Sequence, residues 1–163
     1  MMSHLFIMRH GSAEYSHPNG DSQRNLNVHG VDEAILVGKV FDQIGAPDLV
    51  IHSPYVRTTQ TAAHVVEQLS SKPVVLSAAA LKSGTVPEDI LSEIQGHTGF
   101  ERVLAIGHMP DVAELTLMLT GSEDLPAMFV PATVVSLDLT EGWDIGAMGL
   151  CWMETPVTIQ GRL

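Results

Sequence analysis

The chain has 163 residues, of which 45% are hydrophobic, so it can bury one complete core but is too short for two large independent domains. We therefore expect a single domain over residues 1–163. The formal net charge of −11 at pH 7 argues against nucleic acid or an anionic membrane surface as a partner, because both require a basic surface.

The cysteine content limits both the covalent structure and the compartment. Cys151 is the single cysteine, which excludes an internal disulfide and a cysteine-based zinc site and agrees with a reducing environment. Because it lies in the apolar run 148–153, we expect a buried core residue rather than a nucleophile. The apolar stretch before Arg9 is too short for a secretory signal, and no run reaches membrane-spanning length. We expect a cytoplasmic protein with no membrane partner.

The apolar pattern predicts alternating strands and helices, followed by two extended segments. Asn27 is the expected N-cap of the first helix, and Ser53 with Pro54 is expected to open the second. Pro110 is expected to open the last helix and Gly121 to end it. In chain order we expect a strand at 5–8, a helix at 28–44, a strand at 48–51, a helix from 53 to about 69, a strand at 74–76, a helix at 88–95, a strand at 102–106, a helix at 110–121, and extended segments at 133–139 and 146–153.

This order of elements indicates an α/β fold. We expect a three-layer sandwich in which a mainly parallel central sheet carries an antiparallel C-terminal addition, with helices on both faces. In an open sheet of this kind, ligands bind beyond the carboxyl ends of the strands. Chemically versatile residues at those ends are therefore the candidate site.

Arginines and histidines follow three of the predicted strands. Arg9, His10 and Gly11 end the first strand, Arg57 lies one turn into the helix after the second, and His108 follows the fourth. If these strands are parallel neighbours, the side chains meet at one edge and form a site for a dianionic tetrahedral group. Arg9 and Arg57 would bind phosphate oxygens, with Gly11 allowing close backbone approach, and neutral His10 would attack phosphorus. His108 would stabilise the charge that develops on the phosphoryl group.

Two further cations are weaker candidates for substrate binding. Arg24 could border the pocket, although an ordinary loop arginine is the alternative. Lys82 could bind phosphate or an acidic partner, although a solvated lysine is the alternative. The histidines lack the spacing and the adjacent carboxylates of a metal site, so neither a metal nor another cofactor is expected.

Four motifs follow one another along the chain. They are Arg9-His10-Gly11; Arg24-Asn25-Leu26-Asn27 followed by Gly30; Ser53-Pro54 with Arg57 and Gln60-Thr61-Ala62; and Gly107-His108 with Pro110. Together they resemble the histidine phosphatase superfamily, whose members are phosphoglycerate mutase-like. The resemblance covers nearly the whole chain, and the compact size together with the closing segments 132–133 and 152–153 is most similar to SixA-type phosphohistidine phosphatases. It implies that His10 is phosphorylated during turnover and that Arg9, Arg57 and His108 complete the phosphate pocket.

Two departures from the family pattern bear on the substrate. Many members carry a proton-donating carboxylate after the third strand, whereas here the loop reads Leu-Lys-Ser-Gly over 81–84 and the nearest acids are Glu88 and Asp89. Phosphohistidine needs such an acid less than an alkyl phosphate does, because imidazole is the better leaving group. The usual Arg-Pro-Leu-Thr is Arg-Asn-Leu-Asn here, and Asn27 can replace threonine as a helix cap.

Three functions remain open at this point. The first is a phosphohistidine phosphatase that dephosphorylates a signalling or phosphotransfer protein through a covalent intermediate at His10. The second is a phosphatase or mutase for a small phosphate monoester, which is favoured if Glu88 or Asp89 reaches the leaving oxygen. The third is a non-catalytic phosphate-binding module, which is disfavoured because both histidines and both arginines are present.

Overall fold

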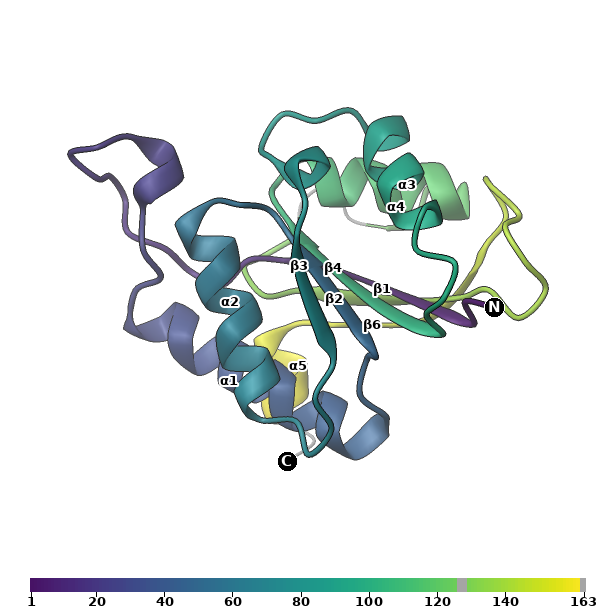
Figure 1. Cartoon of the computed structure of the whole chain (residues 1–163), viewed down its shortest axis with the longest axis horizontal. Helices are drawn as coiled ribbons and strands as arrows, with labels where there is room; N and C mark the ends of the chain where they lie inside the picture. The colour runs from purple at the N-terminus through teal and green to yellow at the C-terminus, as the bar shows by residue number, and fades with distance from the viewer. Residues whose placement is uncertain (126–128, 162–163) are drawn as a thin grey trace.

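The computed structural model describes residues 1–125 and 129–161 and contains one six-stranded sheet with helices on both faces (Figure 1). The strand order is β3-β2-β4-β1-β5-β6. The elements are β1 (His4–Arg9), η1 (Asp21–Gln23), α1 (Val28–Ile44), β2 (Leu49–His52), α2 (Val56–Glu67), β3 (Val74–Ser77), η2 (Ala79–Leu81), α3 (Pro87–Gln95), β4 (Arg102–Gly107), α4 (Asp111–Thr120), β5 (Val134–Asp138), β6 (Gly149–Glu154) and α5 (Pro156–Gln160).

The predicted α/β sandwich is confirmed. The first four strands pair in parallel, while β5 runs antiparallel to β1 and β6 antiparallel to β5. Alternate residues of β1 point to opposite faces of the sheet, as the strand period requires. Leu5 and Ile7 pack in the cluster covered by α3 and α4, whereas Phe6 and Met8 pack in the cluster covered by α1, α2 and α5.

The first helix occupies the predicted range, and its ends have clear local causes. The Asn27 side chain accepts a hydrogen bond from the Gly30 amide at 2.9 Å, so it caps the helix as expected. Gly45 ends it with a φ of 113°, a conformation that favours glycine. The last long helix, α4, likewise follows Pro110 and ends at Gly121.

The predicted start of the second helix, with Ser53 as N-cap and Pro54 as the first helical residue, lies two residues too early. Helix α2 begins at Val56, with Tyr55 at the cap position in an extended conformation. The Ser53 hydroxyl accepts from the Tyr55 amide at 3.2 Å, so it stabilises a turn before the helix rather than the first helical turn. The Ser53 hydroxyl is also engaged elsewhere, because it lies 2.8 Å from Nε2 of His108.

The expectation that Cys151 is buried is also wrong. Its side chain is exposed, because β6 is the outer strand of the sheet and only part of it is covered. The sequence analysis also missed α5, a short helix whose Thr155 cap and Pro156 follow β6 directly. In the described part of the chain, no helix combines the length and the apolar character needed to cross a membrane.

Candidate active site

Three neighbouring strands end at the same edge of the sheet. Arg9 of β1 pairs with Gly107 of β4, and His52 of β2 pairs with Ile106, so the residues that follow these strands lie together. They border a pocket of about 440 Å³. The pocket is lined by Arg9, His10, Ser12, Ala13, Asp21, Arg24, Asn27, Arg57, Ser83, His108, Met109 and Pro131.

The hydrogen bonds of His10 fix its tautomer. Nδ1 lies 2.7 Å from the Gly11 carbonyl, and Nε of Arg57 donates to Nε2 at 3.1 Å. Because a guanidinium can only donate, Nε2 is the unprotonated nitrogen and Nδ1 carries the proton that binds Gly11. The lone pair of His10 Nε2 is therefore held beside a permanent positive charge.

His108 is held in a complementary way. Its Nδ1 accepts from Nη2 of Arg57 at 3.2 Å, so the proton lies on Nε2, which donates to the Ser53 hydroxyl at 2.8 Å. The ring of Tyr55 lies 4.8 Å from the His108 ring, and the Arg57 guanidinium carbon lies 5.1 Å from the centre of the Tyr55 ring. The sequence analysis did not identify Ser53 and Tyr55 as supports of the site, because their proximity to His108 depends on the pairing of β2 with β4.

Burial keeps both imidazoles neutral near pH 7. The pKa of His10 is lowered to about 4, chiefly by burial and in part by the charges of Arg57, Arg9 and Arg24, although the hydrogen bond to Gly11 acts to raise it. Burial, together with the neighbouring His10 and Arg57, lowers the pKa of His108 to about 3. Neutral rings are the form that can act as nucleophile and hydrogen-bond partner.

Asp21 is a pocket residue that the sequence did not reveal. Its carboxylate accepts from Nη2 of Arg57 at 3.0 Å and from Nε of Arg24 at 2.8 Å, and its carbonyl accepts from Nη1 of Arg57 at 2.7 Å. Burial raises the pKa of Asp21, but the hydrogen bonds and charges of the two arginines outweigh it, so the pKa lies below its ordinary value. In the sequence, only its position three residues before Arg24 pointed to this contact.

The segment after His10 is closely packed against the start of α1. A Cβ atom on Gly11 would lie 2.7 Å from the Gly30 carbonyl oxygen, and one on Gly30 would lie 1.9 Å from the Ser12 carbonyl oxygen. The Gly11 amide donates to the Thr61 hydroxyl at 3.1 Å, and Gly11 is absent from the pocket lining. Its two neighbours, His10 and Ser12, line the pocket instead.

The guanidinium of Arg9 has a nitrogen that makes no hydrogen bond within the described residues. One of its terminal nitrogens donates to the Phe129 carbonyl. Its Nε is buried and has no hydrogen-bond partner among the described residues. A buried donor without a partner is costly, so a bound oxyanion would stabilise this side chain.

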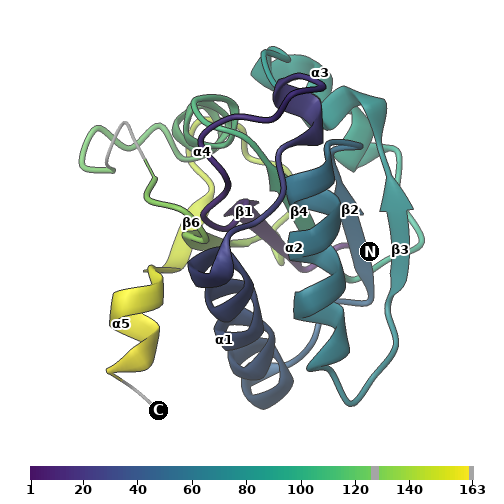
Figure 2. The same cartoon turned by 90° about the vertical axis from the view of Figure 1, so that its left-hand side faces the viewer.

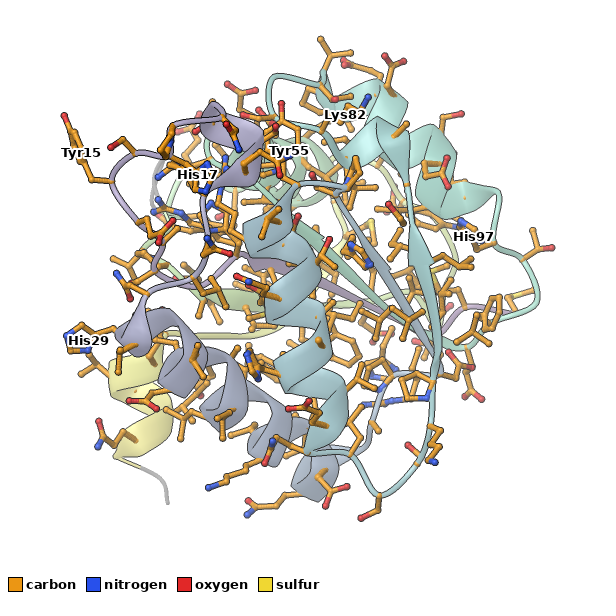
Figure 3. All side chains as sticks on the ribbon, turned by 60° about the vertical axis from the view of Figure 1, so that its left-hand side comes forward. Tyr15, His17, His29, Tyr55, Lys82 and His97 are labelled. Atoms are coloured by element: carbon orange, nitrogen blue, oxygen red, sulfur yellow. The ribbon has the colours of Figure 1, made fainter. Side chains whose placement is uncertain are left out.

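The loop after β3 contributes Ser83 rather than a charged group to the pocket. Lys82 is exposed, as Figure 3 shows, and it is not part of the described lining. Glu88 and Asp89 are likewise exposed in the first turn of α3, outside the lining. The loop is held by the buried carboxylate of Asp111, which accepts from the Gly84 amide at 2.9 Å and whose pKa burial raises.

A metal is not indicated by the side chains around the pocket. Within residues 1–125 and 129–161, no group of three or more His, Cys, Asp or Glu side chains could hold a metal ion. The arrangement instead joins two neutral imidazoles to two guanidiniums, with a third guanidinium, that of Arg24, at the rim. Such a set can bind a tetrahedral oxyanion and offer it a nitrogen nucleophile.

The model of the histidine phosphatase superfamily (branch 1) matches residues 5–80, which contain the Arg9-His10-Gly11 and Arg57 motifs. Over this range, which is somewhat less than half of the chain, the sequence resembles the superfamily. No curated protein matches the sequence significantly. The matched range ends before His108, and the similarity of the remaining part comes from solved structures.

Solved SixA structures cover nearly the whole chain. The protein histidine phosphatase SixA in complex with tungstate is 29% identical, with a TM-score of 0.83 over 94% of this chain and 97% of that one. A proposed SixA phosphohistidine phosphatase from Agrobacterium tumefaciens is 22% identical, with a TM-score of 0.83 over 96% of this chain and 99% of that one. The resemblance to the SixA type is thus confirmed, and the match supports phosphatase activity.

Small-molecule phosphatases share the same fold. A phosphoserine phosphatase variant from Entamoeba histolytica, in complex with phosphoserine, is 13% identical, with a TM-score of 0.68 over 95% of this chain and 98% of that one. This match shows a shared fold alone, so the choice of substrate depends on the chemistry of the pocket.

Proposed function

We propose that this chain is a protein phosphohistidine phosphatase that works without a metal, through a covalent phosphohistidine at His10. One observation carries the proposal. The described pocket lining pairs a neutral imidazole with arginines, and its one carboxylate, that of Asp21, is held by Arg57 and Arg24 with a pKa below the ordinary value. The pocket thus offers a nucleophile and phosphate ligands but no carboxylic acid suited to donating a proton.

Substrate binding begins when a phosphoryl oxygen replaces Asp21 as a hydrogen-bond partner of Arg57. The phosphoryl oxygens of the substrate replace the Asp21 carboxylate on Nη2 and engage the unpartnered Nε of Arg9. Nε2 of His10 then exchanges its hydrogen bond from Arg57 for attack on phosphorus. Because its Nδ1 proton is held by the Gly11 carbonyl, the ring stays oriented and the imidazolium that develops is stabilised.

The leaving group determines how much acid catalysis is required. As the new N–P bond forms, the bond between phosphorus and the substrate imidazole breaks, and the electron pair stays on the departing nitrogen. A substrate ring that carries a proton on its other nitrogen leaves as neutral imidazole, so no donor is required. An alkoxide would need a proton from the protein, and the described lining has no group well suited to supply it.

Hydrolysis of the intermediate completes the cycle. A water attacks the phosphoryl group on His10, the N–P bond breaks, and Nε2 recovers its lone pair while inorganic phosphate leaves. Arg9, Arg57 and His108 stabilise the charge on the equatorial oxygens in both steps. The reported tungstate complex of SixA supports this reading, because tungstate is itself a tetrahedral oxyanion.

The test compares catalytic efficiency on a phosphohistidine-bearing phosphotransfer domain with that on a panel of small phosphate monoesters. We expect a preference of at least about 100-fold for the phosphohistidine protein, because imidazole leaves without acid assistance. His10→Ala should abolish turnover and leave the far-UV circular dichroism spectrum unchanged. His29→Ala is the matched control, since this exposed histidine projects from the start of α1, away from the pocket (Figure 3).

Two outcomes would contradict the proposal. Near-normal activity of His10→Ala would exclude His10 as the nucleophile. A preference for a small ester would instead identify the alternative function, a phosphatase or mutase for a small-molecule monoester, which the shared fold of the phosphoserine phosphatase favours. Glu88 and Asp89 would then be the next residues to substitute, to learn whether α3 moves an acid into the pocket.

A further inference from the structure

A second cavity, of about 260 Å³, lies far along the sheet from the phosphate pocket. It is bordered by His4 and Phe6 of β1 and by Arg102, the first residue of β4, whereas His10 follows the opposite end of β1. The C-terminal half of α1, the strand β6 and the helix α5 form its other walls. Figure 2 shows α5 beside α1, with β6 leading into it.

The interior of this cavity is aromatic. The rings of Phe6 and Trp152 line it with their centroids 5.9 Å apart and their planes tilted by 33°. Val40 and Ile44 of α1 add aliphatic wall. A flat ring bound here would lie against an aromatic and aliphatic wall, which is the kind of apolar surface that small-molecule sites present.

A buried hydroxyl supplies the polar feature. Ser136 of β5 lines the cavity and is only 1% exposed, and its Oγ has no hydrogen-bond partner among the described residues. Leaving a buried hydroxyl unpaired destabilises the folded chain unless another molecule pairs with it. Since Oγ can both donate and accept, it suits a ligand with one polar ring atom.

The charged groups around the cavity favour a neutral ligand. Arg102 donates from Nε to the Ala46 carbonyl at 3.2 Å and from Nη2 to the Gly45 carbonyl at 2.7 Å. Its guanidinium is therefore already hydrogen-bonded to the segment that follows α1. Glu154, of opposite charge, lines the same cavity. With both signs present, neither an anion nor a cation gains a clear advantage.

The volume sets the size of the ligand. A cavity of about 150 Å³ accommodates benzene, so about 260 Å³ accommodates two fused rings. We propose that this cavity is a binding site for a neutral bicyclic heteroaromatic molecule, which packs against Phe6 and Trp152 and hydrogen-bonds to Ser136 Oγ. The site is separate from the phosphate pocket, and the proposal does not depend on the phosphatase substrate.

The probe is indole, with 1-methylindole as a ligand control that lacks the N–H donor. Ligand-observed NMR on the full chain gives the Kd. Cys151 gives an independent measure, because it is the one cysteine in the sequence, is exposed and lines the cavity. We expect indole to slow alkylation of Cys151 by iodoacetamide at least about threefold at saturation.

Three variants test the residues themselves. Ser136→Ala should weaken indole binding about fivefold and leave 1-methylindole unchanged, because it removes one hydrogen bond. It should also unfold at a temperature no lower than the unmodified chain, since the lost hydroxyl has no partner in the protein. Val40→Phe and Ile44→Trp should fill the cavity and abolish binding. Ile44 is 49% exposed, so its variant can fold even if Val40→Phe cannot.

Matched controls lie on the surface outside the cavity. Ser92→Ala and Val157→Phe make the same chemical changes at exposed positions and should leave indole binding unaltered. Equal affinity for the two indoles in the unmodified chain, or indole binding that survives Ile44→Trp, would overturn the proposal. Displacement of indole by inorganic phosphate would do so as well, since it would place the ligand in the phosphate pocket. The absence of both an NMR signal and Cys151 protection would show that no such site exists.

Discussion

The Nε atom of Arg57 lies 3.1 Å from Nε2 of His10, and Nη2 of the same guanidinium lies 3.2 Å from Nδ1 of His108. One side chain on α2 therefore orients two imidazoles that come from two other elements. It also fixes which nitrogen of each ring is unprotonated, because a guanidinium offers only donors. The planar fork of arginine is what permits this double contact.

Substituting Arg57 is the most direct test of whether its guanidinium binds the phosphoryl group. Arg57→Lys keeps the positive charge but cannot contact both rings and a phosphoryl oxygen together, so we expect kcat/KM to fall about 100-fold or more. Lys82→Ala removes an exposed cation outside the pocket lining and should change kcat/KM less than about twofold. Steady-state kinetics on the preferred substrate measure both effects. Equal losses in the two variants would mean that the assigned phosphate ligands are wrong.

We expect Asp21 to compete with phosphate for Arg57. Its carboxylate bonds to Nη2 of Arg57, the atom that an incoming phosphoryl oxygen would use, and it repels a dianion. Asp21→Asn should therefore lower the inhibition constant of inorganic phosphate by about three- to tenfold.

Measuring this constant in parallel for Asp89→Asn separates local competition from net charge. Asp89 is exposed and outside the pocket lining, so the same loss of one negative charge there should leave phosphate binding within about twofold of the starting value. Weaker phosphate binding by Asp21→Asn would show that the carboxylate positions Arg57 instead of competing for it.

The sequence predicted the parts of the fold that local signals determine. The range of α1 followed from the Asn27 cap and from Gly45, and the parallel strands followed from their apolar runs between helices. The start of α2 was misplaced because a Ser-Pro pair has the form of a cap signal. Here the serine hydroxyl contacts the Tyr55 amide before the helix and also His108, which is 55 residues away in the sequence. Long-range contacts of this kind leave no local pattern.

In the candidate site, too, the sequence predicts what depends on local signals and misses what depends on long-range contacts. Arg9, His10, Arg57 and His108 could be predicted to meet because strand ends converge at one edge of a parallel sheet. Asp21 lies in a polar loop whose path over the pocket is set by tertiary contacts, so it could not be predicted. Cys151 was misplaced for a related reason. An apolar run does not reveal whether its strand is central or at the edge of the sheet.

The pKa values of the two site histidines predict an acid-sensitive fold. In the unfolded chain a histidine titrates near 6.5, whereas burial lowers the pKa of His10 to about 4 and that of His108 to about 3. The unfolded state therefore binds more protons below pH 6.5. The stabilising contribution is complete above 6.5 and decreases as the pH falls towards 4, by up to about 1.4 kcal/mol per pH unit for each ring.

Urea denaturation at pH 7.5 and pH 5 measures this loss as a difference in the free energy of unfolding. The loss should be smaller in His10→Gln, because one of the two shifted groups is then absent. It should be unchanged in His29→Gln, which removes an exposed histidine outside the pocket. An undiminished loss in His10→Gln would show that the His10 ring titrates near its ordinary pKa in the folded chain.

The backbone of residues 11–12, which directly follows His10, closely approaches the start of α1. A Cβ atom on Gly30 would lie 1.9 Å from the Ser12 carbonyl oxygen, and this contact is with backbone rather than with a flexible side chain. Gly30→Ala should therefore push the 11–12 segment away from α1, which destabilises the fold by about 1–3 kcal/mol. Because His10 directly precedes that segment and bonds to the Gly11 carbonyl, kcat should fall as well.

Gly99→Ala is the matched control, since a Cβ at Gly99 meets no atom within 4 Å. Urea denaturation and steady-state kinetics on both variants separate the effect of crowding from that of losing a glycine. If Gly30→Ala unfolded at the same urea concentration as Gly99→Ala and kept its activity, the 11–12 segment would be free to shift. The orientation of the His10 ring would then have to come from Arg57 alone.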